Sequence, residues 1–504
     1  MIEIIDVILP VFTLIVAAIL TIPVFKLTCK SRYHNAAIIT WFLLVFIAVG
    51  VSVANLALTY FSVANPPVLN LNINGAEASP FQSSFLIDAL SLYMAIMIVA
   101  VSIIIIIYSV FFVNSVNRIS SRYFAVMLML TAALLGAVLA GDLLTLFIFW
   151  EIATVSAAFL MMFRKNTFSI NATMKYLIMV IIASAFILFG LSLVFGITGS
   201  LNYLAVSSAI STVSSSNLPL LIIAFVFIAA GYAIEAAIVP FHFWLPDAYT
   251  AAPAPSAAFL SALVDQGSYY ILIRILIYII LPPGQGPIDW TIMLSIMAAL
   301  TMIFGNIFAL VQSNIKRLIA YICVADVGYN LIAITCVTAL GITANLYFFL
   351  IGGLTTALAF MAVGILNHHG FKNLNDVAGI GKKLPLVCIA LTIAGLSLAG
   401  VPPFGGFMAK YLVFTAAIEA NYSWLAIIGI LTSILQTAYI FRLVNIMFGK
   451  KAKNNNSVTF NMNKKIFIPI LIMITAIFVL GLFPDLVLQI IQPVINQLPF
   501  LNPI

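Results

Sequence analysis

The chain has 504 residues, of which 64% are hydrophobic and only 7% are charged, with a formal net charge of +7. An average soluble domain carries roughly 25% charged residues, so this composition excludes a soluble globular protein. Apolar runs of about 20 residues, the length that crosses a hydrocarbon layer, recur along the whole chain with short polar breaks. We therefore expect an all-α integral membrane protein.

The apolar runs predict about fourteen transmembrane helices. The first seven lie near 4–25, 36–60, 86–113, 123–140, 142–163, 174–197 and 218–240. The next seven lie near 256–281, 290–312, 318–338, 343–366, 384–417, 423–447 and 466–490. The first run opens with Glu3 and Asp6, without a basic leader or a small-residue cleavage pattern. We therefore interpret it as a retained helix and not as a removable signal.

The basic residues test this number of helices, because they gather in cytoplasmic loops and should fall only in alternate loops. They follow the odd-numbered helices: Lys26, Lys30 and Arg32; Arg118 and Arg122; Arg164, Lys165 and Lys175; Lys316 and Arg317; Lys372, Lys382 and Lys383; and five lysines from Lys450 to Lys465. The alternation supports fourteen spans and predicts that both termini face outward from the cell membrane. The positive charge then reflects topology and anionic lipid, and we expect no nucleic-acid partner.

The cysteine pattern bears on redox chemistry. Cys29, Cys323, Cys336 and Cys388 are scattered and include no CxxC pair. This spacing argues against an iron–sulfur cluster, a zinc site and a disulfide framework. We therefore expect no cofactor, no metal site and no catalytic redox centre in this chain, which leaves open whether it belongs to an enzyme.

Ionisable residues inside the membrane are costly and rare, so each is a candidate functional site. Glu151 lies nine residues beyond Asp142, about 13 Å into its helix at 1.5 Å per residue. Glu235 lies five residues before Pro240, which should break or kink the seventh helix, and broken helices at membrane depth usually line a cavity. The alternatives are a protonated acid bonded to a neighbouring helix for Glu151, and a packing kink with a structural carboxyl group for Glu235.

Four further side chains extend the predicted ion-translocation path. Asp265 and Gln266 lie about ten residues into the eighth helix, where Asp265 can titrate and Gln266 can only relay through hydrogen bonds. Asp326 lies near the middle of the tenth helix, with a structural salt bridge as the alternative. Lys410 follows VPPFGGFMA, whose prolines and glycines should break the twelfth helix, and a buried lysine suits a proton relay.

Other polar residues are weaker candidates. Thr355, Thr356 and His242 can extend a relay together with water. His368 and His369 can do so too, but their position at a helix end favours a solvated loop.

The order of the helices predicts two inverted five-helix repeats. Five is an odd number, so equivalent helices in the two units run in opposite directions, and the fourth helix of each unit, helix 7 or helix 12, is broken. Glu151 then corresponds to Asp326 and Glu235 to Lys410, which predicts two half-channels that meet at the midplane. The predicted domains are the N-terminal three helices (1–122), the first half-channel unit (123–281), the second, inverted half-channel unit (290–447), and a cytoplasmic loop with a C-terminal helix (448–504).

Five stretches carry a family resemblance: GDLLTLFIFWE with Glu151, MKYLIM with Lys175, HFWLPDAY with Asp247, IKRLIAY with Lys316 and Arg317, and GVPPFGGFMAKY with Lys410. They resemble the antiporter-like proton-translocating membrane subunits of respiratory complex I, of Mrp-type cation/proton antiporters and of energy-converting membrane-bound hydrogenases. The match runs from about residue 85 to about residue 445. It implies fourteen core helices and a proton path driven by a redox reaction in a separate peripheral arm.

Within this resemblance, Glu151 and Lys410 match the family's proton path, whereas other positions depart from it. The departures stand where the family usually has a lysine or histidine: Glu235 on helix 7, Gln266 beside Asp265 on helix 8, Asp326 on helix 10 and Thr356 on helix 11. A coupled pair of carboxyl groups can pass a proton or bind sodium through oxygen ligands, so the ion is a proton or a sodium ion.

The expected function is that of a nonredox ion-translocating subunit of a multisubunit energy-converting oxidoreductase, such as a membrane-bound hydrogenase or an NADH or F420H2 dehydrogenase-like complex. Its expected partners are other membrane subunits and the lipid membrane. A subunit of an Mrp-type Na+/H+ antiporter and a non-pumping structural spacer are the alternatives. A free-standing transporter of a small organic solute agrees with an inverted repeat but not with the motifs.

Overall fold

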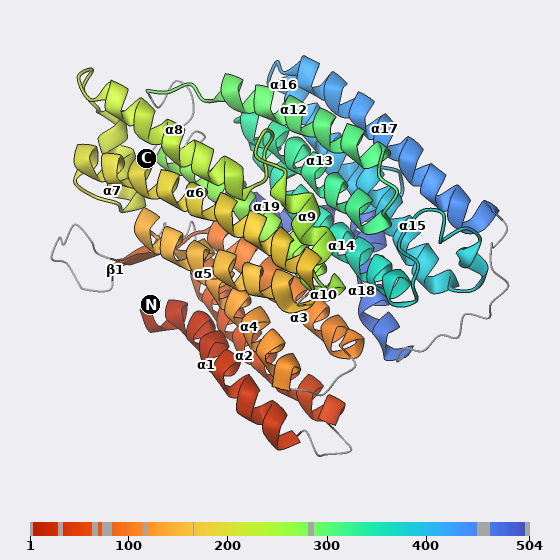
Figure 1. The fold of residues 1–504 in the computed structure, drawn as a ribbon. Coiled ribbons are helices and arrows are strands. Elements are labelled where there is room, and N and C mark those ends of the chain that lie inside the picture. Colours follow the sequence, from red (N-terminus) through yellow and green to blue (C-terminus); the bar gives the residue numbers. More distant parts are fainter. Residues whose placement is uncertain are drawn as a thin grey trace.

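The computed structural model describes residues 4–28, 34–62, 69–72, 83–113, 118–164, 166–280, 287–450 and 464–498. They form a bundle of long helices that run side by side, with a small two-stranded hairpin at one end (Figure 1). Thirteen of the described helices are long and apolar enough to cross a membrane. One more span is divided into two shorter helices, so the prediction of about fourteen spans agrees with the structure.

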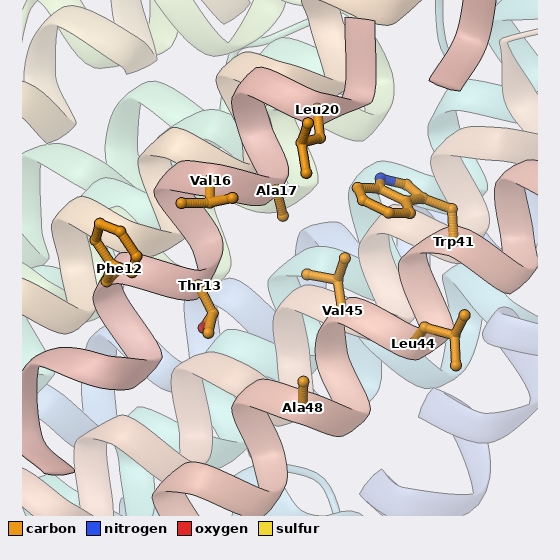
Figure 2. Close-up of a pocket in the computed structure, with 9 residues that line it drawn as sticks. All are labelled: Phe12, Thr13, Val16, Ala17, Leu20, Trp41, Leu44, Val45 and Ala48. Carbon is orange, nitrogen blue, oxygen red and sulfur yellow. The ribbon is translucent and has the colours of Figure 1, made fainter. Parts of the chain in front are cut away.

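The N-terminal part comprises α1 (Ile4–Thr28), α2 (His34–Phe61), β1 (Leu69–Asn72), β2 (Ser84–Ile87) and α3 (Ala89–Phe112). The predicted start of the third helix at residue 86 is wrong, because Ser84–Ile87 pairs antiparallel with β1. Asp88 then caps α3 by accepting the backbone N–H of Ser91 at 2.8 Å. Figure 2 shows an apolar groove between α1 and α2, with Phe12 and Leu20 on one side and Trp41 on the other.

The middle of the chain begins with two helices joined by a tight turn and includes a short helix that the sequence did not predict, α7. Its helices are α4 (Arg118–Leu139), α5 (Leu143–Met161), η1 (Met162–Arg164), α6 (Thr167–Thr198), α7 (Tyr203–Ser211), α8 (Leu218–Glu235) and α9 (Trp244–Ala251). The predicted eighth helix is one unbroken run of α10 (Ala254–Phe259), η2 (Leu260–Val264), α11 (Asp265–Ile273) and η3 (Arg274–Ile279), in which η2 and η3 are π-helical.

The C-terminal part contains the second half of the long helices. They are α12 (Thr291–Leu310), α13 (Ile315–Thr335), α14 (Ala339–His368), η4 (Ile380–Lys382), α15 (Pro385–Ala399), α16 (Gly405–Glu419), α17 (Ser423–Gly449), η5 (Lys464–Ile466), α18 (Phe467–Leu482) and α19 (Asp485–Ile495). The predicted single helix at 466–490 is wrong, because α18 ends before Pro484 and α19 starts afresh. Residues 451–463 of the predicted cytoplasmic loop lie outside the described residues.

Both predicted helix breaks are present. Residues 236–243, which include Pro240, separate α8 from α9, and the loop's backbone is satisfied inside the protein. The indole N–H of Trp244 donates to the carbonyl of Ile234 at 2.9 Å, and the N–H of Val239 donates to Thr301 Oγ1 at 3.1 Å. In the other break Gly400 ends α15 with φ at +81°, a conformation that favours glycine. Such breaks are tolerated at membrane depth only where protein or water satisfies the backbone.

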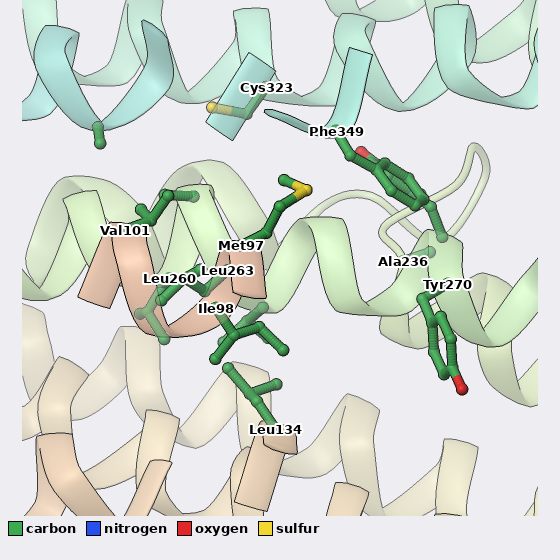
Figure 3. Packing of buried hydrophobic residues seen from close by; sticks show 14 of the residues in the cluster. Met97, Ile98, Val101, Leu134, Ala236, Leu260, Leu263, Tyr270, Cys323 and Phe349 are labelled. Atoms are coloured by element: carbon green, nitrogen blue, oxygen red, sulfur yellow. The ribbon is translucent and has the colours of Figure 1, made fainter. Parts of the chain in front are cut away.

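The core lies around α13, α14 and the run from α10 to η3. The π-helical residues Leu260 and Leu263 pack near Met97 and Ile98 of α3 (Figure 3). Leu134 of α4 lies beyond Ile98 in the same view. Helices α1, α2, α6 and α18 instead keep broad apolar faces exposed, as expected of surfaces that face lipid. Charged residues on the central helices are therefore shielded from lipid by other helices.

Two short backbone bridges have the same pattern at different places in the chain. Asp142, the N-cap of α5, pairs antiparallel with Asn202, and Asn314, the N-cap of α13, pairs antiparallel with Asn373. The same backbone hydrogen bond accompanies each bridge. The N–H of Leu143, just after Asp142, donates to the carbonyl of Leu201, just before Asn202, at 2.9 Å, and the N–H of Ile315 donates to the carbonyl of Lys372 at 3.0 Å. The starts of α5 and α13 are thus held in equivalent ways.

Candidate ion-translocation path

Two carboxyl groups lie within electrostatic range of each other in the first half of the bundle. Glu151 lies on the ninth residue of α5, and its Oε1 accepts a hydrogen bond of 2.5 Å from the hydroxyl of Ser184 on α6. Glu235 is the last residue of α8, only 6% exposed, and its Oε1 has no hydrogen-bond partner among the described residues. The two predicted acids thus come from neighbouring parts of the fold, on α5 and at the end of α8. One free oxygen leaves Glu235 able to accept a proton or a water.

Tyr176 of α6 connects this pair to the next acid. The phenol is fully buried and lies within electrostatic range of Glu151, Glu235 and Asp265. Its ring packs against Trp244 of α9 with centroids 4.9 Å apart. Trp244, the first residue after the helix break, therefore packs against the tyrosine that lies within range of all three acids.

Asp265 begins α11, directly after the π-helical segment η2. Single π-helical turns inside α-helices are frequent at functional sites, because the extra residue shifts the side chains that follow. The hydroxyl of Tyr249 on α9 donates a short hydrogen bond to Asp265 Oδ1. Gln266 is 5% exposed, and its Oε1 has no hydrogen-bond partner among the described residues. Both predicted residues therefore point into the protein and not into lipid.

Asp326 occupies the centre of α13, which is nearly all buried. Neither carboxyl oxygen of Asp326 has a hydrogen-bond partner among the described residues. Asp265 on one side and Lys410 on the other lie within its electrostatic range. The alternative of a salt bridge with fixed geometry is absent for Asp326 in the described part of the chain, because the described ion pairs involve other residues. A buried carboxyl group without partners needs a proton or water to satisfy it.

Lys410 is the sixth residue of α16 and is 3% exposed. Its Nζ donates to Gln436 Oε1 at 2.7 Å and to Ser433 Oγ at 2.9 Å, both on α17. The ammonium group also lies 4.0 Å from the centroid of the Tyr329 ring on α13. Tyr329 follows Asp326 by three residues, so both side chains occupy the same face of α13 and face Lys410. The lysine is thus held by neutral groups, with one acid in reach.

The weaker candidates take different places. Thr355 and Thr356 donate to carbonyls of their own helix, at Ile351 and Gly352. His242 is buried in the break after α8, whereas His368 is exposed at the end of α14, as its loop position predicted.

Sequence reasoning missed three buried polar groups. Arg274 on η3 is fully buried and pairs with Asp88, and Lys316, assigned to a cytoplasmic loop, is 1% exposed. Tyr249 was quoted in a motif without a role. An arginine within the apolar run 256–281 was a usable signal, because an intramembrane charge requires a partner. The sequence contains no signal for Lys316, which looks like an ordinary loop lysine.

A family model described as "NADH:quinone oxidoreductase/Mrp antiporter, TM" matches residues 140–436. The NADH-quinone oxidoreductase subunit N of Desulforamulus reducens is 31% identical, with 79% of this chain and 83% of that protein covered. The F(420)H(2) dehydrogenase subunit N of Methanosarcina mazei is 29% identical, covering 86% of this chain and 89% of that protein.

Solved structures share the fold. A chain of the membrane-bound sulfane sulfur reductase, an archaeal respiratory membrane complex, superimposes with a TM-score of 0.86 at 26% identity and 97% coverage of both chains. A chain of the Mrp complex from Dietzia sp. superimposes with a TM-score of 0.84 at 22% identity and 98% coverage of both. The second likeness concerns the fold alone.

Proposed function

The chain belongs to the NADH:quinone oxidoreductase/Mrp antiporter membrane family, and we propose that it carries protons across the membrane as a nonredox subunit of a multisubunit respiratory complex. Its relatives are antiporter-like membrane subunits of such complexes.

One observation carries the proposal: ionisable side chains, all buried except the half-buried Glu151, follow one another through the bundle. They run from Glu151 and Glu235 through Asp265 to Asp326 and Lys410. Neighbours in this row lie within electrostatic range of each other, except that Glu235 and Asp265 are linked through Tyr176, which lies within range of both. Buried charges destabilise a fold unless they are paired, and the described ion pairs include none of these five residues. Glu235 and Asp326 keep carboxyl oxygens without a hydrogen-bond partner among the described residues. These oxygens suit stepwise proton transfer through intervening water, and Gln266 can orient that water.

The two bridges support the proposed inverted repeat. Asn314, at the start of α13, lines a cavity together with Arg164, which follows α5 at the end opposite to Asp142. The equivalent bridges therefore lie at opposite ends of the bundle, as an inverted repeat requires. Glu151 and Asp326 then lie nine and twelve residues after their caps, one helical turn apart in depth. Glu235 lies before the break in its helix, whereas Lys410 lies after the break in its own. The two broken helices are therefore equivalent in the proposed repeat, but these two residues are not at equivalent positions.

The proposed orientation places both termini outside. The described basic residues that support this orientation lie where an odd-numbered span ends and the following even-numbered span begins, which is one end of the bundle. They are Lys26, Arg122, Arg164, Lys316, Arg317, Lys372, Lys382, Lys383, Lys450, Lys464 and Lys465. The one described arginine near the other end, Arg274, is neutralised by Asp88. Basic residues gather on the cytoplasmic side of membrane proteins, so that end is proposed to be cytoplasmic.

Glu235→Lys in the assembled complex tests the path and the ion. The ammonium group supplies a countercharge to Glu151, which changes the pH profile of turnover if the pair passes protons. If the pair binds sodium, the lysine abolishes sodium-stimulated turnover, because it repels the cation and offers no oxygen ligand. Turnover and ion uptake are measured in proteoliposomes across pH, with and without sodium.

Glu419→Lys is the matched control, because it makes the same change of charge at an exposed position at the end of α16. A loss that both variants share reflects assembly or net charge. Unchanged rate, pH profile and sodium response in Glu235→Lys contradict the proposed path and favour a structural spacer.

A further inference from the structure

A polar cavity lies at the ends of several spanning helices, away from the row of central acids. Its volume is about 420 Å³. It joins the end of α5 and the start of α6 to the start of α13 and the end of α14, so it bridges the two proposed repeat units. Its lining consists of Arg164, Asn166, Phe168, Thr250, Asn314, Lys316, Asn367 and Lys372.

The side chains that line this cavity carry a net positive charge. Three lining side chains are cationic, Arg164, Lys316 and Lys372, and no lining residue is acidic. Two acids nearby are already engaged. Asp247 on α9 is held by Lys175 at 2.7 Å and by Arg317 at 2.9 Å, and Asp376 accepts the backbone N–H groups of Lys372 and Asn373 at 3.3 and 2.8 Å. Like charges in a partly desolvated space repel each other, and Arg164 and Lys316 do so here. An anion in the cavity would relieve that repulsion.

Lys316 makes this a built site and not a chance gathering of surface lysines. It is 1% exposed, and its Nζ donates to the carbonyls of Ala252 and Thr250 at the end of α9. These two bonds leave the third N–H of the ammonium group for a ligand. The fold therefore fixes one cation at the cavity while Arg164 and Lys372 remain exposed and able to close over a ligand.

Two long helices add to the positive potential. Asn166 caps the start of α6 by accepting the N–H of Ser169 at 2.7 Å, and Asn314 caps the start of α13 by accepting the N–H of Arg317 at 3.1 Å. Helix N-termini carry a partial positive charge and favour anions. Both converge on the cavity that the three cationic side chains line.

We propose that this cavity binds a phosphate group between the two helical units, with Arg164, Lys316 and Lys372 as its cationic ligands. A guanidinium binds two phosphate oxygens at once, and a lysine contributes a point charge, so the three side chains match a tetrahedral dianion or a phosphodiester. Phe168, which is 49% exposed at the cavity, gives an apolar neighbour to the acyl part of a lipid. The site does not depend on whether the chain transports ions.

The phosphate can come from an anionic phospholipid or from solution, and two measurements on the purified whole complex separate these sources. Native mass spectrometry, after exchange into nanodiscs of phosphatidylglycerol or of phosphatidylcholine, detects a retained phospholipid. Phosphorus NMR, with inorganic phosphate added to the delipidated complex, detects free phosphate. Each is made on wild type, on Arg164→Gln with Lys372→Gln, and on Lys382→Gln, an exposed lysine outside the cavity.

The double variant spares Lys316, whose bonds to α9 serve the fold. Loss of two charge-assisted contacts should weaken binding at least about tenfold, whereas Lys382→Gln should bind as wild type does. Retention of phosphatidylglycerol that the double variant loses identifies a lipid headgroup, and a phosphate signal that it loses identifies the free anion. Absence of both, or equal binding in the double variant and the control, overturns the proposal.

Discussion

The guanidinium of Arg274 on η3 holds the carboxylate of Asp88 at the start of α3 through two hydrogen bonds of 2.5 and 2.9 Å. Arg274 is fully buried and Asp88 is 2% exposed. Tyr270 adds a hydroxyl acceptor at 3.1 Å, and the ring of Tyr278 lies 4.7 Å from the guanidinium carbon. The pair therefore ties the N-terminal helices to the helix that carries Asp265.

Asp88→Asn should destabilise the complex by about 3–5 kcal/mol, because it leaves the buried guanidinium without a countercharge. Asp88→Asn combined with Arg274→Met should recover most of that loss, since it removes both charges while asparagine still caps α3. Thermal unfolding of the purified complex measures both effects. Arg442→Met, at an exposed position on α17, is the control. Equal stability of Asp88→Asn and wild type would show that the pair is not structurally important.

Lys410→Ala should lower ion transport by at least about tenfold while the complex still assembles. The loss of a charge-assisted hydrogen bond raises a barrier by roughly 1.5–3 kcal/mol, and 1.36 kcal/mol corresponds to tenfold in rate. Lys410→Arg should rescue poorly, because arginine keeps its proton. Transport into proteoliposomes, compared with the amount of assembled complex, gives the ratio. Full transport by the alanine variant would remove Lys410 from the path.

Tyr249→Phe should slow transport by up to about tenfold, because it removes the hydroxyl that donates to Asp265 and leaves the ring packing intact. Tyr411→Phe, at an exposed tyrosine on α16, controls for the loss of a phenol. The measurement is the rate of ion uptake per assembled complex. A rate in Tyr249→Phe equal to that of the control would show that Asp265 does not depend on this hydroxyl.

Cysteine labelling in intact cells should find Lys450→Cys reactive only after the cytoplasm is opened, and Ser215→Cys reactive from outside. Both positions are exposed. Lys450 follows the end of α17 and Ser215 precedes the start of α8, and these two helix ends lie on opposite sides of the membrane in the proposed topology. Cys323, Cys336 and Cys388 are buried, so replacing Cys29 with serine removes the remaining background. The reverse pattern of labelling would invert the whole orientation.

Local sequence features were enough to predict the membrane class, about fourteen spans and the positions of both helix breaks. These features are local: an apolar run of sufficient length must be a helix in lipid, and Pro240 or the prolines and glycines before Lys410 interrupt any helix that contains them. The depth of Glu151 and Asp326 also follows from counting residues along a helix. The family likeness was visible in five short stretches for the same reason.

The partner of each buried charge could not be predicted from the sequence, because it comes from a distant part of the chain. Arg274 and Asp88 are 186 residues apart, and Lys316 finds its carbonyl partners 64 and 66 residues earlier in the chain. The π-helical turn before Asp265 and the hairpin before α3 likewise left no local signal. Helices in a membrane can pack in many rotations with similar apolar burial, so the facing side chains are set by the contacts of the whole bundle and not by any one segment.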